Sequence, residues 1–173
     1  LTVSGVLSGN GILNHTGQTV NLVGNAGNFS GNSNWLVNNF TLGLPSGTIT
    51  LAGSGALTVS GVLDIGATST LDLASKVVTF SGSGTPITVT NGGIFTPSSS
   101  TVQYTGTSAT NIVGSGAGVT YNNLSLIPAG TVVHTLGTAA SQSITVNGNM
   151  TIGTNNAAHA VDVNMATWDP DLI

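Results

Sequence analysis

The residues best suited to chemistry are two carboxylates and one amine in the middle of the chain, Asp64, Asp72 and Lys76. A pair of carboxylates converging in a groove is what a polysaccharide-cleaving enzyme uses for acid and base catalysis. Such enzymes also need cations, and this chain has a single Lys or Arg. We therefore expect Asp64 and Asp72 to be solvated acids at strand edges, where charge discourages unwanted pairing. A polysaccharide-active β-helix enzyme is the less favoured alternative.

Lys76 follows Asp72 by four residues and has two interpretations. It is a surface cation near an acid, an interaction worth at most about 1 kcal/mol, or it forms an intramolecular isopeptide bond. The second interpretation requires a carboxylic acid close by, and only Asp64 or Asp72 could serve. We expect the surface cation.

The three histidines, His15, His134 and His159, are scattered along the chain. None has a second ligand at the spacing typical of a metal site. We expect them at exposed turn or strand positions. The sequence therefore predicts no catalytic residue, no bound metal and no cofactor.

Two Thr-x-Thr pairs occur, at Thr48/Thr50 and at Thr88/Thr90. A flat, regular ladder of threonines would indicate ice binding. Two isolated copies do not make such a ladder, and Thr is a good strand former because of its branched Cβ. We expect ordinary strands at both places.

Five aromatic residues have two possible roles. Exposed on one face, they would form a sugar-stacking platform or an anchor at an interface, and a carbohydrate-binding module of a secreted protein is the corresponding alternative function. Buried, they would fill the core or cap its ends, which we favour. The residues are Trp35, Phe40, Tyr104, Tyr121 and Trp168.

The composition excludes several classes of function. One cation and a net charge of −4 argue against nucleic acid and anionic membranes as partners, because both are bound through Lys and Arg. Only 3% of the residues are charged, whereas about a quarter are charged in an ordinary domain. Such a surface has little electrostatic repulsion to keep copies apart. With no Cys, the low charge favours an extracellular or cell-surface location, and no apolar run is long enough to cross a membrane.

Internal repeats indicate the fold. The heptapeptide Leu-Thr-Val-Ser-Gly-Val-Leu occurs at 1–7 and again at 57–63, and a close relative occupies 144–150. With weaker copies between them, the spacing predicts stacked units with a period of roughly 28 residues.

Each unit is expected to be strand rather than helix. Apolar and hydroxyl residues alternate with period two, as in Leu57 and Val59 around Thr58. Asn-Gly pairs such as 91–92 and 147–148 are strong turn signals. The sequence thus predicts a single all-β domain over 1–173, a parallel β-helix of roughly six to eight irregular rungs, with a β-sandwich as the alternative. The segment 24–47 fits the repeat worst and is expected to be an elaborated loop or flap.

The stretch 92–126 resembles repeats of very large secreted bacterial surface proteins of the autotransporter or haemagglutinin adhesin type. The resemblance rests on Gly92–Pro97, Ser100–Gly106 and Tyr121–Leu126, and 144–153 continues it. It implies a parallel β-helix, export, and a structural or adhesive role, and it supplies no catalytic residues.

We therefore expect a subunit or segment of a self-assembling surface fibre, with copies of itself as its partner and surface glycans as a further candidate partner. Solenoid ends are open strand edges that pair with other chains unless capped. The subunit contacts are predicted in 1–9 and 160–173, at Leu1, Val3, Val6, Leu7, Val161, Val163 and Trp168.

Overall fold

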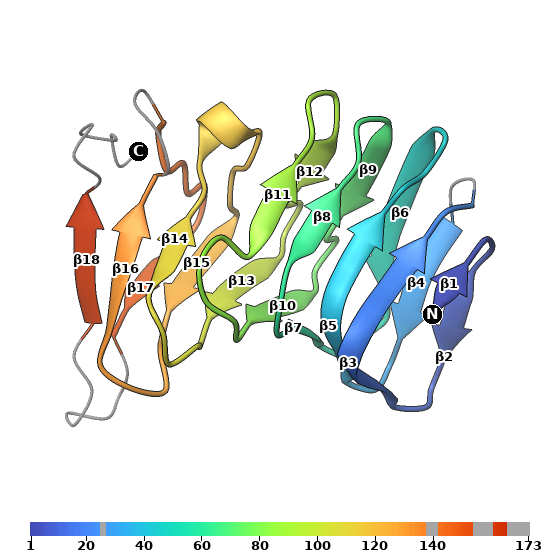
Figure 1. The fold of residues 1–173 in the computed structure, drawn as a ribbon, viewed down its shortest axis with the longest axis horizontal. Coiled ribbons are helices and arrows are strands. Elements are labelled where there is room, and N and C mark those ends of the chain that lie inside the picture. The colour runs from blue at the N-terminus through green and yellow to red at the C-terminus, as the bar shows by residue number, and fades with distance from the viewer. Residues whose placement is uncertain (25–26, 138–141, 154–160, 166–173) are drawn as a thin grey trace.

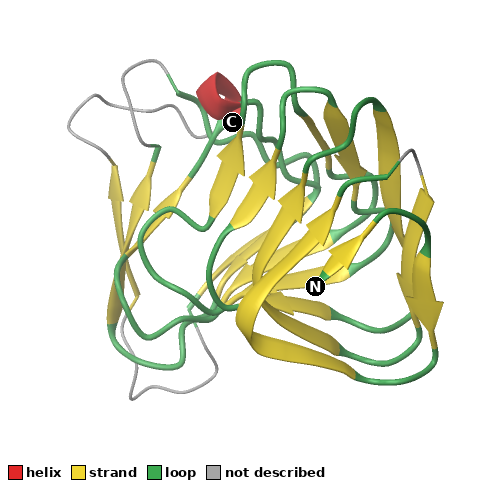
Figure 2. Cartoon of the chain, turned by 45° about the vertical axis from the view of Figure 1, so that its right-hand side comes forward, coloured by secondary structure: helices red, strands yellow, loops and turns green. Residues whose placement is uncertain are grey.

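The computed structural model describes residues 1–24, 27–137, 142–153 and 161–165. They form a β-solenoid of about six turns, in which every hydrogen-bonded strand pair of the described residues is parallel (Figure 1). This confirms the predicted fold and excludes the β-sandwich, which is built from antiparallel sheets. The one helical element in the described part is a single 3-10 turn, η1 (Ser115–Ala117) (Figure 2).

The strands fall into three sheets. The largest contains β1 (Thr2–Val3), β3 (Leu13–Leu22), β5 (Trp35–Leu42), β7 (Leu57–Val59), β8 (Leu63–Ile65), β10 (Val77–Phe80), β11 (Ile87–Val89), β13 (Thr101–Tyr104), β15 (Asn123–Leu126) and β17 (Met150–Ile152). The second contains β2 (Leu7–Gly9), β4 (Gly27–Gly31), β6 (Gly47–Ala52), β9 (Ser69–Asp72) and β12 (Ile94–Thr96). The third contains β14 (Thr110–Ile112), β16 (Val132–Leu136) and β18 (Val161–Met165).

Each turn of the coil has three faces. The first face stacks the N-terminal halves of β3 and β5 with β7, β10, β13, β15 and β17. The second face stacks β1 with the C-terminal halves of β3 and β5, then β8 and β11. An isolated bridge from Gly84 to Thr110 continues it into β14, β16 and β18. The third face stacks β2, β4, β6, β9 and β12.

The coil period is shorter than the repeats predicted. Successive partners on the first face lie 21 to 26 residues apart, not roughly 28. These partners are Leu13, Trp35, Leu57, Val78, Val102, Leu124 and Met150.

The difference arises because the repeated heptapeptide marks a corner rather than a whole coil. The copy at 1–7 leads from the second face to the third, since Val3 pairs with Leu22 and Leu7 with Phe29. The identical copy at 57–63 leads from the first face to the second. The relative at 144–150 leads from the third face to the first. A strand, a tight turn and a strand suit all three corners, so the motif recurs out of phase with the coil.

The segment 24–47 is not a loop or flap in its described part. It carries β4, which pairs with β2 and β6, and β5, which pairs with β3, β7 and β8. Its aromatic residues Phe29, Trp35 and Phe40 are buried and touch one another, with ring centroids 4.3 and 4.8 Å apart. The large rings replace the Leu and Val of the other coils, and this is why the segment fits the repeat poorly in sequence.

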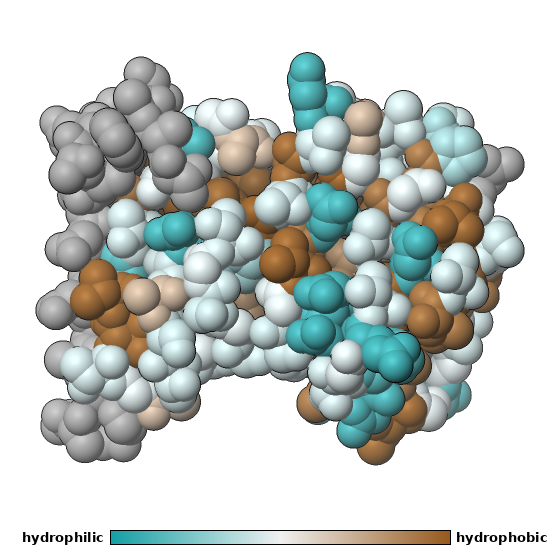
Figure 3. All heavy atoms as spheres, in the orientation of Figure 1, coloured by the Kyte–Doolittle hydropathy of each residue, from teal (hydrophilic) through white to brown (hydrophobic). Residues whose placement is uncertain are grey.

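The core is a set of side-chain columns along the axis of the coil. Alternate residues of each strand point inward, and the first face contributes columns such as Val59, Phe80 and Tyr104, each at most 1% exposed. Burying one such side chain stabilises the fold by about 1.5–3 kcal/mol. The outward positions between them hold mainly hydroxyl and amide side chains. On the face that Figure 3 shows, residues of intermediate hydropathy lie between small clusters of apolar residues and small clusters of polar residues.

Candidate functional site

The first coil of the solenoid is the candidate site, because its strands are paired on one side only. β1 pairs with β3, β2 pairs with β4, and residues 13–15 of β3 pair with β5. No other described strand contacts the opposite edges of these three segments. A row of backbone N–H and C=O groups is therefore free on all three faces at this end, which is the arrangement that accepts a further strand.

Apolar side chains surround these free edges. Leu1, Val6 and Ile12 are 48%, 61% and 75% exposed. Val3, Leu7 and Leu13 of the same coil are half-buried and pack against the core. The core columns therefore end in side chains that are partly exposed to solvent. The described part of this end carries no capping helix.

The structure gathers four of the predicted contact residues in this first coil, namely Leu1, Val3, Val6 and Leu7. Val161 and Val163 lie in β18 at the opposite end of the solenoid, in register with Val132 and His134 (Figure 1). Trp168 lies outside the described residues. The assignment of all seven as subunit contacts is still a prediction.

Sequence reasoning missed two further residues of the first coil, Ile12 and Leu13. The signal for them in the sequence is the adjacent apolar pair ahead of the polar run Asn14-His15-Thr16, which lies outside the repeated heptapeptide at 1–7. At the other end, Ile152 of β17 is 50% exposed, and β17 pairs only with β15 among the described strands.

Asp64 and Asp72 do not form a catalytic pair. Asp64 lies in β8 on the second face, and Asp72 ends β9 on the third face. Each carboxylate accepts a hydrogen bond from a hydroxyl of the next coil, Thr88 Oγ1 at 2.7 Å and Ser98 Oγ at 2.6 Å. They therefore link neighbouring coils on separate faces.

Lys76 is not the surface cation that the sequence predicts. Its side chain is 5% exposed and runs back along the corner between the third and first faces. The ammonium donates to the backbone carbonyls of Gly31 at 3.2 Å, Gly53 at 3.0 Å and Ala52. Burial lowers the pKa of this amine from its ordinary value, because the charged form loses water, and the three carbonyls take the place of part of that water. An isopeptide bond would need a carboxyl or carboxamide side chain, and all three partners of the ammonium are backbone oxygens.

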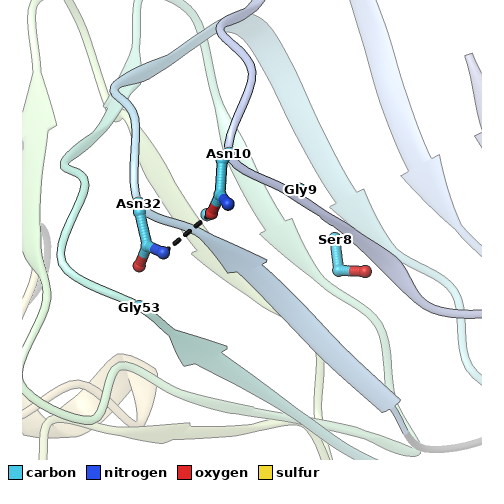
Figure 4. Close-up of a pocket in the computed structure, with 6 residues that line it drawn as sticks. Ser8, Gly9, Asn10, Asn32 and Gly53 are labelled. Atoms are coloured by element: carbon cyan, nitrogen blue, oxygen red, sulfur yellow. Dashed lines mark hydrogen bonds between the residues drawn. The ribbon is translucent and has the colours of Figure 1, made fainter.

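A shallow recess of about 240 Å³ lies at the same corner of the first three coils (Figure 4). Its polar side chains are Ser8, Asn10 and Asn32, and Asn32 Nδ2 donates to Asn10 Oδ1 at 2.8 Å. Two of its glycines, Gly31 and Gly53, present their carbonyls to Lys76. Asn32 Oδ1 in turn accepts from the backbone N–H of Ser54 at 3.3 Å, so these amides link successive coils and the recess is best explained as a corner ladder.

His134 contradicts the expectation of exposed histidines. It is fully buried in β16, and neither ring nitrogen has a hydrogen-bond partner in the described part of the chain. Its ring lies edge-on to Tyr104, with centroids 6.3 Å apart. Burial lowers its pKa because the charged ring would be desolvated. His15 is half-buried in β3, and His159 lies outside the described residues.

The aromatic residues are core rather than platform in the described part of the chain. Trp35, Phe40, Tyr104 and Tyr121 are each at most 5% exposed. The two tyrosine hydroxyls lie 3.2 Å apart, and Tyr121 donates to the carbonyl of Val113 at 2.8 Å. The pKa of both tyrosines is raised, chiefly by burial. A sugar-stacking strip cannot be built from these four rings.

The described residues contain no cluster of three or more His, Cys, Asp or Glu that could hold a metal ion. Within the same ranges, no helix is long and apolar enough to span a membrane. Searches of protein-family models, of curated proteins and of solved structures found no match to this chain. The structure itself defines the class of this chain as a parallel β-solenoid.

Proposed function

We propose that this chain is an extracellular structural protein, a subunit or segment of a self-assembling surface fibre or adhesin, that works by pairing strands rather than by catalysis. The observation that supports this most is the open first coil. Its strands have free edges on all three faces, and its apolar residues Leu1, Val6 and Ile12 are exposed.

Strand addition at this end would extend both the parallel ladder of hydrogen bonds and the apolar core. A parallel strand from a second copy would pair with the free edge, and its inward side chains would cover Val3, Leu7 and Leu13, which are half-buried now. A contact between unlike ends of two copies propagates into a filament when it does not close into a ring.

The composition favours the same function. The chain has six charged residues in 173, so copies repel each other little. The low charge and the resemblance of 92–126 to secreted bacterial surface repeats support an extracellular location. The carbohydrate-binding alternative requires an exposed aromatic platform, whereas the described aromatic residues named above are buried.

The test is electron microscopy and sedimentation velocity of the native protein over a range of concentrations. The wild-type chain is expected to form filaments. The double variant Val6→Lys and Ile12→Lys is expected to stay dispersed, because it places two charges at the edge that must be desolvated.

The matched control is Val77→Lys. Val77 is 37% exposed, but it lies in β10, which pairs with β7 on one side and with β13 on the other. It should leave filaments intact. Equal loss in both variants would show that the first coil is not the contact, and a wild-type chain that stays monomeric at every concentration would overturn self-assembly for this chain.

A further inference from the structure

The first face carries a second regular feature, a row of small polar side chains that runs across five coils. In-register pairing aligns the central outward residues of β7, β10, β13, β15 and β17. The inward neighbours of these residues in β7 to β15 are buried, so the row points to solvent. The row is Thr58, Thr79, Gln103, Ser125 and Thr151.

A parallel row lies two residues further along the chain in the coils of β7, β10 and β13, whereas the corresponding residues of the next two coils are Ile127 and Gly153. It consists of Ser60, Ser81 and Thr105, and the backbone ladder reaches it, because Ser81 N donates to Val59 O at 3.1 Å and Thr105 N donates to Phe80 O at 2.9 Å. Within a sheet, neighbouring strands are about 4.8 Å apart and alternate residues of one strand about 6.6 Å apart. The two rows therefore form a two-dimensional grid of small polar side chains, which are the hydroxyls of Ser and Thr except for the amide of Gln103.

This grid is electrically neutral. Strands β7, β10, β13, β15 and β17 contain no Asp, Lys or His. Asp64 lies on the second face and Asp72 on the third. Lys76 directly precedes β10, but its ammonium is turned inward onto backbone carbonyls.

From this arrangement we propose that the first face, from β7 to β17, binds ice. A crystal of ice presents uncharged oxygens at repeats of the same order in two directions, and a regular grid of hydroxyl and methyl groups can hold water molecules in such an array. Charged groups would oppose this, because they keep their own hydration shells. A polysaccharide fits the face less well, since the aromatic residues described in this part of the chain are buried rather than available for stacking.

The Thr-x-Thr pairs of the sequence are not the basis of this site. Thr50 lies beside Asp72 on the third face, and Thr88 lies beside Asp64 on the second. Each pair therefore shares its face with a carboxylate. The neutral grid is assembled from single Thr and Ser residues of different coils, which no local motif in the sequence reveals.

The test measures retention in slowly growing ice, crystal shape and thermal hysteresis for the purified chain. The wild-type protein is expected to be retained and to shape crystals. Thr79→Lys, which places a charge at the centre of the grid, is expected to abolish both effects. Gln103→Thr, which completes the row of hydroxyls, is expected to increase the hysteresis.

Thr70→Lys is the matched control, because Thr70 is an equally half-buried outward residue of β9 on the third face. It should retain wild-type ice binding, and thermal unfolding of each variant confirms that the solenoid is intact. Exclusion of the wild-type chain from ice, or equal losses for Thr70→Lys and Thr79→Lys, would overturn the proposal. Binding to insoluble cellulose without any effect on ice would also overturn it, and would assign the face to a polysaccharide. Because the grid is on the side of the solenoid and not at its end, failure of this test leaves the fibre proposal standing.

Discussion

At the scale of single residues, burial of the polar ring of His134 costs folding free energy. Both of its nitrogens are buried without a partner there, opposite Thr110 in the ladder and against the ring of Tyr104. A buried polar group without a hydrogen bond costs about 1–3 kcal/mol. The neutral ring is the form that the core tolerates.

This leads to a prediction about pH. Because burial holds the pKa of folded His134 below 6.5, the unfolded chain takes up a proton near pH 6.5 while the folded chain does not. Stability is therefore full above that pH and falls as the pH drops below it. His134→Phe should remove this loss and keep the edge-on ring contact, so the variant should gain about 1–3 kcal/mol over wild type, and more at about pH 5 than at neutral pH.

Chemical denaturation of both proteins at several pH values checks the prediction. Asn147→Ala, which changes an exposed residue without a titratable group, serves as the control and should follow the wild-type curve. A His134→Phe protein that is less stable than wild type at every pH would show that the ring nitrogens have a partner, such as a buried water.

At the scale of elements, asparagine side chains stabilise the corners of the coil. Asn39 Oδ1 accepts from the backbone N–H of Val62 at 2.9 Å, and Asn34 and Asn123 do the same for Ala56 and Asn149. The side-chain amide thus replaces a ladder hydrogen bond where the strands turn. This bond also explains the glycine at position 61, because a Cβ there would lie 2.2 Å from Asn39 Oδ1.

We predict that Asn39→Ala destabilises the solenoid by about 1–3 kcal/mol, because it leaves the part-buried N–H of Val62 without an acceptor. Urea denaturation followed by circular dichroism measures the change. Asn147→Ala is the control, since Asn147 is exposed in a turn and its recorded hydrogen bond uses only its backbone. Equal effects of the two substitutions would contradict the corner role.

At the scale of the whole molecule, the near absence of charge decides how copies meet. Association at the first coil would rest on backbone hydrogen bonds and apolar burial, which salt screens little. We predict that filament formation changes little when sodium chloride rises from about 0.01 M to about 1 M. Sedimentation velocity across this range measures it. A steep decline with salt would indicate that the few ionic groups hold the contact.

The sequence alone was enough to predict the all-β class and the parallel solenoid. Alternation of Leu57, Thr58 and Val59 fixes which side chains face inward, because strand side chains alternate with period two. The scarcity of charge also follows from composition, and it holds whatever the fold.

Only the tertiary structure decided which residues share a face. A local motif that suits every corner cannot report the coil period, so the repeats at 1–7 and 57–63 were placed on equivalent positions that they do not occupy. Lys76 finds its carbonyls one and two coils away, and His134 is buried by neighbours from other coils. The neutral grid of Thr58 and Thr79 likewise depends on register between strands. Sequence patterns record periodicity along the chain, whereas these contacts depend on the number of residues in each corner, which only the packed coil determines.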